Sequence, residues 1–462
     1  MHEWIPNAPQ GRLDVQPGSN QAIYADVLET ERSPINGAGE KLAWLGKGFL
    51  AVLDQGLISG SNFLIGIVLA RWLVPEQFGA YALAFSIFLF LAGFQNALFL
   101  EPMSVFGPAS HRRCLQSYLG TLLGLNFILT IFLSILLCTA AIVLRPFSTN
   151  HALTPALFGV CVGIPLILSF WLCRRAAYLE LAPGLAASSA SAYCLVLITL
   201  LLVIRRLGWL SSFAAFVIQS IAALAAAVFL LIFLKPQFDS RTGPAASAII
   251  DQHWRFGRWS MGTVFVYWLS GNAYYVVVGA FLRMEDVAAL RALQNFTLPF
   301  GQLLTALSLL VLPWASARFA EEGRLGLQQR IRQITMMFTG GACAYLAVIW
   351  LFGGRLIGVL YDGRYTEFAH LLPLVAAPMV IAAASQGSSI AILAMQFPAD
   401  VFLAYTAAGI ATVLTGVPLT RYYGLTGAAL GILISSLAFF TTITFRYRTR
   451  LKVTHDETAI AS

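Results

Sequence analysis

Hydrophobic residues occur in long continuous runs that short polar segments separate. Each run is long enough, as an α-helix, to cross the ~30 Å hydrocarbon core of a bilayer. The runs are continuous rather than alternating, which favours helices over barrel strands. The sequence therefore predicts an all-α, polytopic membrane protein with about 12 transmembrane helices. The runs lie near residues 48–70, 80–103, 115–144, 155–173, 186–204, 210–234, 257–282, 293–314, 334–353, 370–394, 399–418 and 424–445.

One polar segment divides the runs into two sets of six, and two more lie at the ends of the chain. Residues 1–47 are rich in proline and charge and predict a mobile cytoplasmic N-terminal tail. Residues 235–256 predict a cytoplasmic linker, and residues 446–462 a cytoplasmic C-terminal tail. The spans between them form an N-lobe, 48–234, and a C-lobe, 257–445.

The two sets repeat each other weakly in sequence. A shift of about 210 residues aligns Asn62 with Asn272, and a similar shift near the end of each set aligns Ser220 with Ser436. An even number of spans per set makes both sets enter the membrane in the same sense. Such repeats form two pseudo-symmetric six-helix bundles, with the binding site between them near the midplane.

The distribution of positive charge indicates the orientation in the membrane. The net charge is +8, but Lys and Arg lie in short segments between apolar runs, so we expect no nucleic-acid partner. If both ends are inside, 20 of the 29 Lys and Arg residues lie in inside segments and 9 in outside segments. The positive-inside rule therefore predicts that both termini are cytoplasmic.

The residues that usually carry enzyme chemistry form no recognisable motif. The six cysteines lie in or beside apolar runs without a CxxC pair, and the six histidines are scattered. There is no P-loop and no HExxH motif. We therefore predict no catalytic residue, no metal and no cofactor, and the short outside segments leave no room for an external catalytic domain.

Two polar residues of the first span are candidates for a site. Asp54 and Asn62 share one face of this helix, and polar groups inside a membrane helix are expensive unless they face a cavity or a partner. One hypothesis is that Asp54 binds a coupling cation or proton while Asn62 bonds the hydroxyl groups of a sugar. The alternative is that both make hydrogen bonds between helices.

The seventh and eighth spans supply a second set of candidates. Trp268, Asn272 and Tyr275 share one helix face, where aromatic and amide groups suit a sugar ring. Gln294 and Asn295 form a polar pair just inside the next span. Interfacial anchoring or packing explains the aromatic residues equally well, and the amides can bond a neighbouring helix instead.

Arginines gather at the predicted cytoplasmic mouth. Their planar forks suit a pyrophosphate group, although these residues also produce the positive-inside bias. Arg258 lies within the beginning of a span, which favours a role in binding. The site candidates are Arg174, Arg175 and Arg258, with Arg112, Arg113 and Arg255 beside them.

Three stretches resemble bacterial polysaccharide flippases, the O-antigen and exopolysaccharide exporters of the multidrug/oligosaccharidyl-lipid/polysaccharide superfamily. They are ARWLVPEQFGAYALA (Ala70 to Ala84), GRYTEFAHLLPLVA (Gly363 to Ala376) and YYGLTGAALGILIS (Tyr422 to Ser435). The chain departs from the family at Ala289–Leu290–Arg291, where a Gly-Tyr pair is common. The resemblance implies a two-lobed fold shared with multidrug antiporters, and a lipid-linked oligosaccharide as cargo.

These observations lead to one main hypothesis and two alternatives. The chain is expected to flip a lipid-linked oligosaccharide across the inner membrane by alternating access, for lipopolysaccharide or exopolysaccharide biosynthesis. Its expected partners are that lipid, membrane lipids, and a glycan polymerase and glycosyltransferases of the same pathway. The first alternative is an ion-coupled multidrug or cation antiporter on the same fold. The second is a membrane enzyme such as a glycan polymerase or ligase.

Overall fold

The computed structural model describes residues 38–147, 151–238 and 245–460. Contacts divide the chain into two compact units, Met1–Leu50 and Ala51–Ser462. In the first unit, the described residues 38–50 form the beginning of one helix. The second unit contains the remaining helices, and the described residues include no strand.

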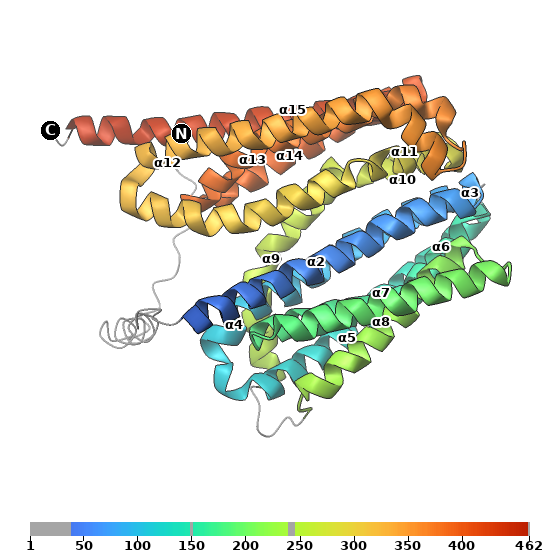
Figure 1. Ribbon diagram of the computed structural model, residues 1–462, viewed down its shortest axis with the longest axis horizontal. Coiled ribbons are helices and arrows are strands. Elements are labelled where there is room, and N and C mark those ends of the chain that lie inside the picture. Colours follow the sequence, from blue (N-terminus) through green and yellow to red (C-terminus); the bar gives the residue numbers. More distant parts are fainter. Residues whose placement is uncertain (1–37, 148–150, 239–244, 461–462) are drawn as a thin grey trace. The chain divides into compact units, whose positions relative to one another are not determined.

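The helices before the linker are joined by short connections (Figure 1). We call this set, from Ala51 onward, the first group. In chain order it consists of α2 (Ala38–Trp72), α3 (Pro75–Gln95), η1 (Asn96–Leu100), α4 (Glu101–Ser110), η2 (Arg112–Cys114), α5 (Leu115–Leu144), η3 (Arg145–Phe147), α6 (Leu153–Leu179), α7 (Pro183–Arg206) and α8 (Ser212–Leu234).

Helix α9 (Ala246–Ser270) follows the linker and packs against helices of both halves of the chain, η1 and α14 among them. The helices after it form the second group (Figure 1). They are α10 (Ala273–Phe281), α11 (Met284–Asn295), α12 (Leu298–Leu360), η4 (Thr366–Leu371), α13 (Leu372–Ala394), α14 (Pro398–Ala411), η5 (Thr412–Gly416) and α15 (Val417–Ile460).

The described helices account for the twelve expected crossings. Ten stretches are long and apolar enough to cross a membrane, and α9 with α10, bent by 45°, makes an eleventh. One of the ten, Pro398–Leu451, has 54 residues; as one straight helix it would extend about 80 Å, more than twice the thickness of a bilayer core. Gly424 breaks this stretch with φ 61° and ψ −141°, so it supplies two crossings. The predicted fold class is confirmed.

Helix boundaries differ from the expected spans where the helix extends into polar sequence. Residues 1–37 of the expected tail lie outside the described residues, and α2 already begins at Ala38. Helix α9 begins at Ala246, inside the expected linker, and α15 continues through the expected C-terminal tail to Ile460. The eighth span, expected from residue 293, is preceded by α11 from Met284. Hydropathy marks only the part of a helix that needs an apolar solvent, whereas the hydrogen-bonded backbone continues beyond it.

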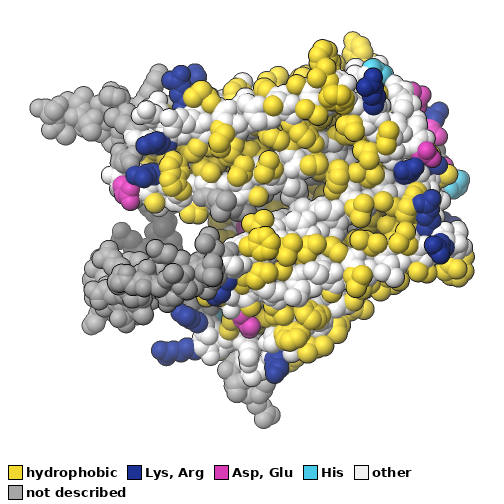
Figure 2. Space-filling model, viewed as in Figure 1, with side chains coloured by type: hydrophobic (Ala, Val, Ile, Leu, Met, Phe, Trp, Pro, Cys, Tyr) yellow, Lys and Arg dark blue, Asp and Glu magenta, His cyan; other side chains and the backbone are white. Residues whose placement is uncertain are grey.

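Successive helices alternate in direction, so their connections gather at two ends. The Trp72 end carries the connections after Trp72, Arg206, Phe281 and Leu360, and the Arg174 end carries those after Ser110, Leu179 and Ala394. Figure 2 shows hydrophobic side chains across the middle of one face, with charged side chains toward its two ends. A band of this kind is what a lipid-exposed surface requires.

The two groups pack tightly against each other at the Trp72 end. One hydrophobic cluster runs through the first group and includes Val287 and Tyr361 of the second, whereas a separate cluster around Ala315 and Tyr447 belongs to the second group alone. Gly79 of α3 lies so close to α11 that a Cβ on it would stand 1.9 Å from the Met284 carbonyl oxygen. The absence of a side chain lets the two backbones meet, as small residues do in membrane bundles.

Candidate functional site

Ser86 of α3 joins the two halves of the chain near the break between α9 and α10. Its hydroxyl donates a 2.7 Å hydrogen bond to the backbone oxygen of Asn272, and its own backbone oxygen accepts a 2.9 Å bond from Trp268 Nε1. The ring of Trp268 also lies 4.9 Å from that of Phe90. Trp268 and Asn272, both expected to bind sugar, therefore also hold the region of the α9–α10 break against α3. Asn272 accepts the Ser86 bond with its backbone oxygen, not with its side-chain amide.

A cationic residue lies next to this contact. Arg291 Nη1 donates a 3.2 Å hydrogen bond to the hydroxyl of Tyr275, which in turn donates to the side-chain oxygen of Gln294. The guanidinium also lies 5.4 Å from the centre of the Phe85 ring. Arg291 Nε is buried without a partner, so the guanidinium retains one unused donor. We call Ser86, Trp268, Asn272, Tyr275, Arg291 and Gln294 the interface cluster.

The sequence interpretation did not treat Arg291 as a site residue. It counted this arginine in an outside connection, because the eighth span was expected to begin at residue 293. The structure instead places Arg291 in α11, seven residues after Met284, or about 10 Å along the helix. The available signal was an arginine within three residues of the polar pair Gln294 and Asn295.

Asn295 lies apart from the interface cluster, between α2 and the end of α12. Its Nδ2 donates to the Tyr361 hydroxyl at 3.4 Å, and its buried Oδ1 has no partner. That oxygen is 3.0 Å from the position that a Cβ on Gly66 would occupy. Asn62, one turn earlier on α2, is exposed.

Asp54 lies in a network of strong hydrogen bonds toward the Arg174 end. Its buried carboxylate accepts from Arg174 Nε at 2.8 Å and from Arg174 Nη2 at 2.6 Å, and the Tyr178 hydroxyl donates to it at 2.5 Å. Arg174 Nη2 also donates to the side-chain oxygen of Gln55 at 3.1 Å. The sequence assigned Asp54 to an ion and Arg174 to a substrate, but the structure makes these two residues partners.

The remaining arginine candidates lie at the surface. Arg175 is exposed beside Arg174, and Arg258 is exposed with its guanidinium 5.5 Å from the centre of the Trp259 ring. Both belong to helices that reach the Arg174 end. Both are therefore accessible to an anion from solution at that end.

A second charged network, in the second group, was missed by the sequence interpretation. Asp400 of α14 is buried and accepts from Arg446 Nε at 2.7 Å and from Arg450 Nε at 2.8 Å. Both arginines lie on the part of α15 that was expected to be a polar tail. Arg450 also lies 4.0 Å from the centre of the Phe397 ring. The pairing ties the end of α15 to the beginning of α14.

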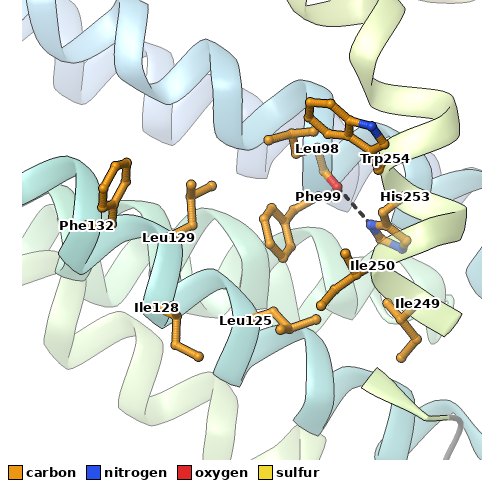
Figure 3. Close-up of a pocket in the computed structure, with 10 residues that line it drawn as sticks. All are labelled: Leu98, Phe99, Leu125, Ile128, Leu129, Phe132, Ile249, Ile250, His253 and Trp254. Carbon is orange, nitrogen blue, oxygen red and sulfur yellow. Dashed lines mark hydrogen bonds between the residues drawn. The ribbon is translucent and has the colours of Figure 1, made fainter. Parts of the chain in front are cut away.

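An apolar pocket of about 360 Å³ opens between η1, α5 and α9 (Figure 3). His253 is the polar residue on its wall, and its Nδ1 bonds the Leu98 carbonyl oxygen at 2.8 Å. A carbonyl accepts only, so Nδ1 carries a proton. Nε2 shares a 2.8 Å hydrogen bond with the Tyr118 hydroxyl. The hydrocarbon lining includes Leu125, Ile128, Phe132, Ile250 and Trp254.

The described residues offer no candidate site for a metal ion. Within residues 38–147, 151–238 and 245–460, no three His, Cys, Asp or Glu side chains gather closely enough to bind one. The six cysteines are free thiols.

Comparisons with known structures identify the fold. An inward-facing multidrug resistance transporter of the MATE family in the MOP superfamily superposes with a TM-score of 0.77 at 14% identity, covering 88% of this chain and 99% of that one. An outward-facing structure of such a transporter gives 0.61 at 14% identity, covering 88% and 95%. The lipid II flippase MurJ, in an inward closed conformation, gives 0.66 at 13% identity, covering 88% and 87%.

No curated protein matches the chain in sequence. A family model described as polysaccharide biosynthesis protein matches residues 68–370, which is more than half of the chain. The structural neighbours described above are transporters and a flippase rather than enzymes. The chain is therefore a member of the polysaccharide biosynthesis protein family, built on the fold of the MOP superfamily transporters.

Proposed function

We propose that the protein flips a polyprenyl-pyrophosphate oligosaccharide from the inner to the outer leaflet of the cytoplasmic membrane. The family match supports a role in polysaccharide biosynthesis, and the likeness to a lipid II flippase supports a lipid-linked substrate. A sugar and pyrophosphate head group cannot cross hydrocarbon without hydrogen-bonding partners. The protein would supply those partners while the lipid tail stays in the bilayer.

The observation that carries this proposal is the chemistry of the interface cluster. It offers an arginine with an unused donor, two aromatic residues and two amide side chains, and no carboxylate. Charge-assisted bonds from Arg291 suit a phosphate oxygen, and Tyr275 and Gln294 suit sugar hydroxyls. The apolar pocket beside η1 (Figure 3) suits a prenyl or acyl chain on the lipid side of the first group.

Alternating access would work between the two groups. The tight packing of Gly79 against α11 closes the Trp72 end. Basic residues predominate at the Arg174 end, which makes that end cytoplasmic under the positive-inside rule. Both termini are then cytoplasmic and the present state faces inward, in keeping with the higher TM-score against the inward-facing relative than against the outward-facing one. The substrate would enter from the pathway's glycosyltransferases and leave toward its polymerase.

Ion coupling at Asp54 remains part of this proposal. A carboxylate already held by Arg174 and Tyr178 can take a cation only after Arg174 has moved away. The transition between states would provide that movement. The membrane potential acting on the anionic head group is the other available energy source.

An ion-coupled multidrug or cation antiporter is the alternative, because the MATE relatives share the fold. Binding a cationic drug calls for an uncompensated carboxylate in the translocation path. The two carboxylates that the structure buries almost completely within its described helices, Asp54 and Asp400, are both engaged by arginines. The charge of the interface cluster therefore favours an anionic substrate.

Deleting the gene tests the two functions against each other. The flippase predicts that one surface glycan disappears while its lipid-linked precursor accumulates on the cytoplasmic leaflet, with unchanged sensitivity to cationic dyes. Restoring the wild-type gene must reverse both effects. Dye hypersensitivity with a normal surface glycan would establish the antiporter instead, and loss of glycan without accumulated precursor would place the protein at an earlier step.

A further inference from the structure

Three arginines converge on a second pocket, of about 410 Å³, at the Trp72 end. Arg71 lies at the end of α2, Arg205 at the end of α7, and Arg364 in the connection after α12. Asp362 is the acidic residue on the wall. The pocket is thus lined by three positive charges and one negative charge, at the end opposite to the network of Asp54 and Arg174.

Each arginine has an anchor that leaves donors available. The Arg205 guanidinium stacks 3.7 Å above the ring of Trp72. Arg364 donates one hydrogen bond, from Nη1, to the backbone oxygen of Leu73. Arg71 meets Asp362 at 3.7 Å, and both side chains are substantially exposed, so this contact is weak. Stacking and backbone bonding fix the orientation of a guanidinium without neutralising its charge.

These arginines occur on the side of the membrane where basic residues are disfavoured. The proposed orientation places 9 of the 29 Lys and Arg residues outside, and three of those nine line this one pocket. The positive-inside rule does not explain why three arginines gather at one outside position. Converging guanidinium groups on a concave surface are instead the usual device for binding a phosphate.

We propose that this pocket binds a phosphate or diphosphate group and is formed only while the Trp72 end is closed. Arg71, Trp72 and Arg205 belong to the first group, whereas Asp362 and Arg364 belong to the second. Separation of the groups at this end would pull the walls apart. An anion that binds only the closed form stabilises it by its differential affinity for the two states. This inference rests on the proposed alternating access and adds an anion-dependent control of its outer gate.

The binding test uses the purified full-length protein in nanodiscs of phosphatidylcholine, with inorganic diphosphate as the probe. Arg205→Gln and Arg71→Gln should each weaken binding by about tenfold or more, because each removes a charge-assisted bond. Asp362→Asn should strengthen it, an effect that misfolding does not produce. Arg206→Gln is the matched control, because Arg206 is exposed on the next position of α7 and does not line the pocket.

The source of the phosphate is distinguished by a second arm with nanodiscs that contain polyprenyl diphosphate. Binding of inorganic diphosphate identifies a soluble anion, and binding of the lipid alone identifies a head group; either result supports the pocket. No binding in either arm, or equal affinity of wild type and Arg205→Gln, would overturn it.

The gate is followed by spin labels at Glu76→Cys and Glu367→Cys, which lie in α3 and η4 on the two sides of the Trp72 end. Diphosphate should increase the population with the shorter distance, and the increase should disappear with Arg205→Gln. An unchanged distance distribution at saturating diphosphate would overturn the coupling.

The binding test does not depend on transport. If the protein binds diphosphate but deleting its gene leaves the surface glycan intact, the flippase is rejected and the pocket is kept. Glycan loss on deletion without diphosphate binding would reject the pocket alone.

Discussion

Arg174 donates two hydrogen bonds to the carboxylate of Asp54, from Nε to Oδ1 at 2.8 Å and from Nη2 to Oδ2 at 2.6 Å. The carboxylate is fully buried, and the arginine side chain keeps 18% of its surface exposed. Such a pair joins α2 to α6 across 120 residues of sequence. The Tyr178 hydroxyl donates a further hydrogen bond to the carboxylate, and Arg174 donates one to the side-chain oxygen of Gln55.

We predict that Asp54→Asn lowers the stability of the detergent-solubilised protein by about 3 kcal/mol, because it leaves a partly buried arginine without its counter-charge. The double variant Asp54→Leu with Arg174→Leu should recover most of this loss, since replacing a whole buried pair by apolar groups is close to neutral. Thermal unfolding followed by circular dichroism measures both. Asp251→Asn is the control, because its pair with Arg255 is largely exposed and should shift stability by less than about 1 kcal/mol.

Transport by the same double variant separates coupling from structure. If Asp54 carries the coupling ion, the stable double variant should still fail to restore the surface glycan. A double variant that is both stable and active would remove Asp54 from the translocation mechanism and leave it a purely structural role.

Hydropathy predicted the twelve crossings because lipid forces each backbone to satisfy its own hydrogen bonds within a helix. The run predicted at 115–144 coincides with α5, and that at 210–234 begins two residues before α8. The partners of polar residues were beyond reach, since Asp54 and Arg174 meet only through the packing of α2 on α6. Local sequence does not show which faces of two distant helices will pack together.

Asp400 should hold the last part of α15 in place. We predict that Asp400→Asn removes the charge that Arg446 and Arg450 share and raises hydrogen–deuterium exchange over residues 446–451. Each charge-assisted bond contributes about 1.5–3 kcal/mol, so protection there should fall by tenfold or more. Glu321→Gln, which removes an exposed partner of Arg318, should leave the exchange of α15 unchanged. Unaltered exchange with Asp400→Asn would show that the charge of Asp400 does not order this segment.

The candidate site was predictable in part. Helical spacing placed Trp268, Asn272 and Tyr275 on one face of a single helix, whereas the structure breaks that helix between Ser270 and Ala273. Their partner Ser86 lies in the other half of the chain, and nothing in its local sequence distinguishes it from other serines in apolar runs. Arg291 escaped notice because a hydropathy boundary fell two residues beyond it.

Arg291 is predicted to be essential for transport of an anionic head group. Arg291→Gln should reduce surface glycan at least about tenfold, because the lost charge-assisted bonds contribute about 1.5–3 kcal/mol. Arg291→Lys keeps the charge but loses the planar fork and should fall in between. Arg355→Gln, an exposed arginine at the same end, serves as control. Full transport by well-expressed Arg291→Gln would exclude this residue from the path of the substrate.

The proposed orientation is open to direct labelling. In a background without the native cysteines, His151→Cys and Glu367→Cys should react with an impermeant maleimide added to intact cells. Arg113→Cys and Arg330→Cys should react only after the membrane is permeabilised, because the excess of Lys and Arg places them in the cytoplasm. All four side chains are exposed. The reverse pattern would invert the topology and with it the direction of transport.

Gly79 is predicted to act as the contact on which the Trp72 end closes. A Cβ there would meet the Met284 carbonyl oxygen at 1.9 Å, and backbone of a packed helix cannot yield as a side chain can. Gly79→Leu should therefore disfavour the closed state and leave the open state unchanged, which shifts the population toward the open form. Transport should fall severely, while Val287→Cys, at a position buried in the closed contact, should label faster from outside when combined with Gly79→Leu than alone. Gly124→Leu is the matched control, because a Cβ at Gly124 meets nothing within 4 Å. If Gly79→Leu transported normally with unchanged labelling, closure at this contact would not be a step of the transport cycle.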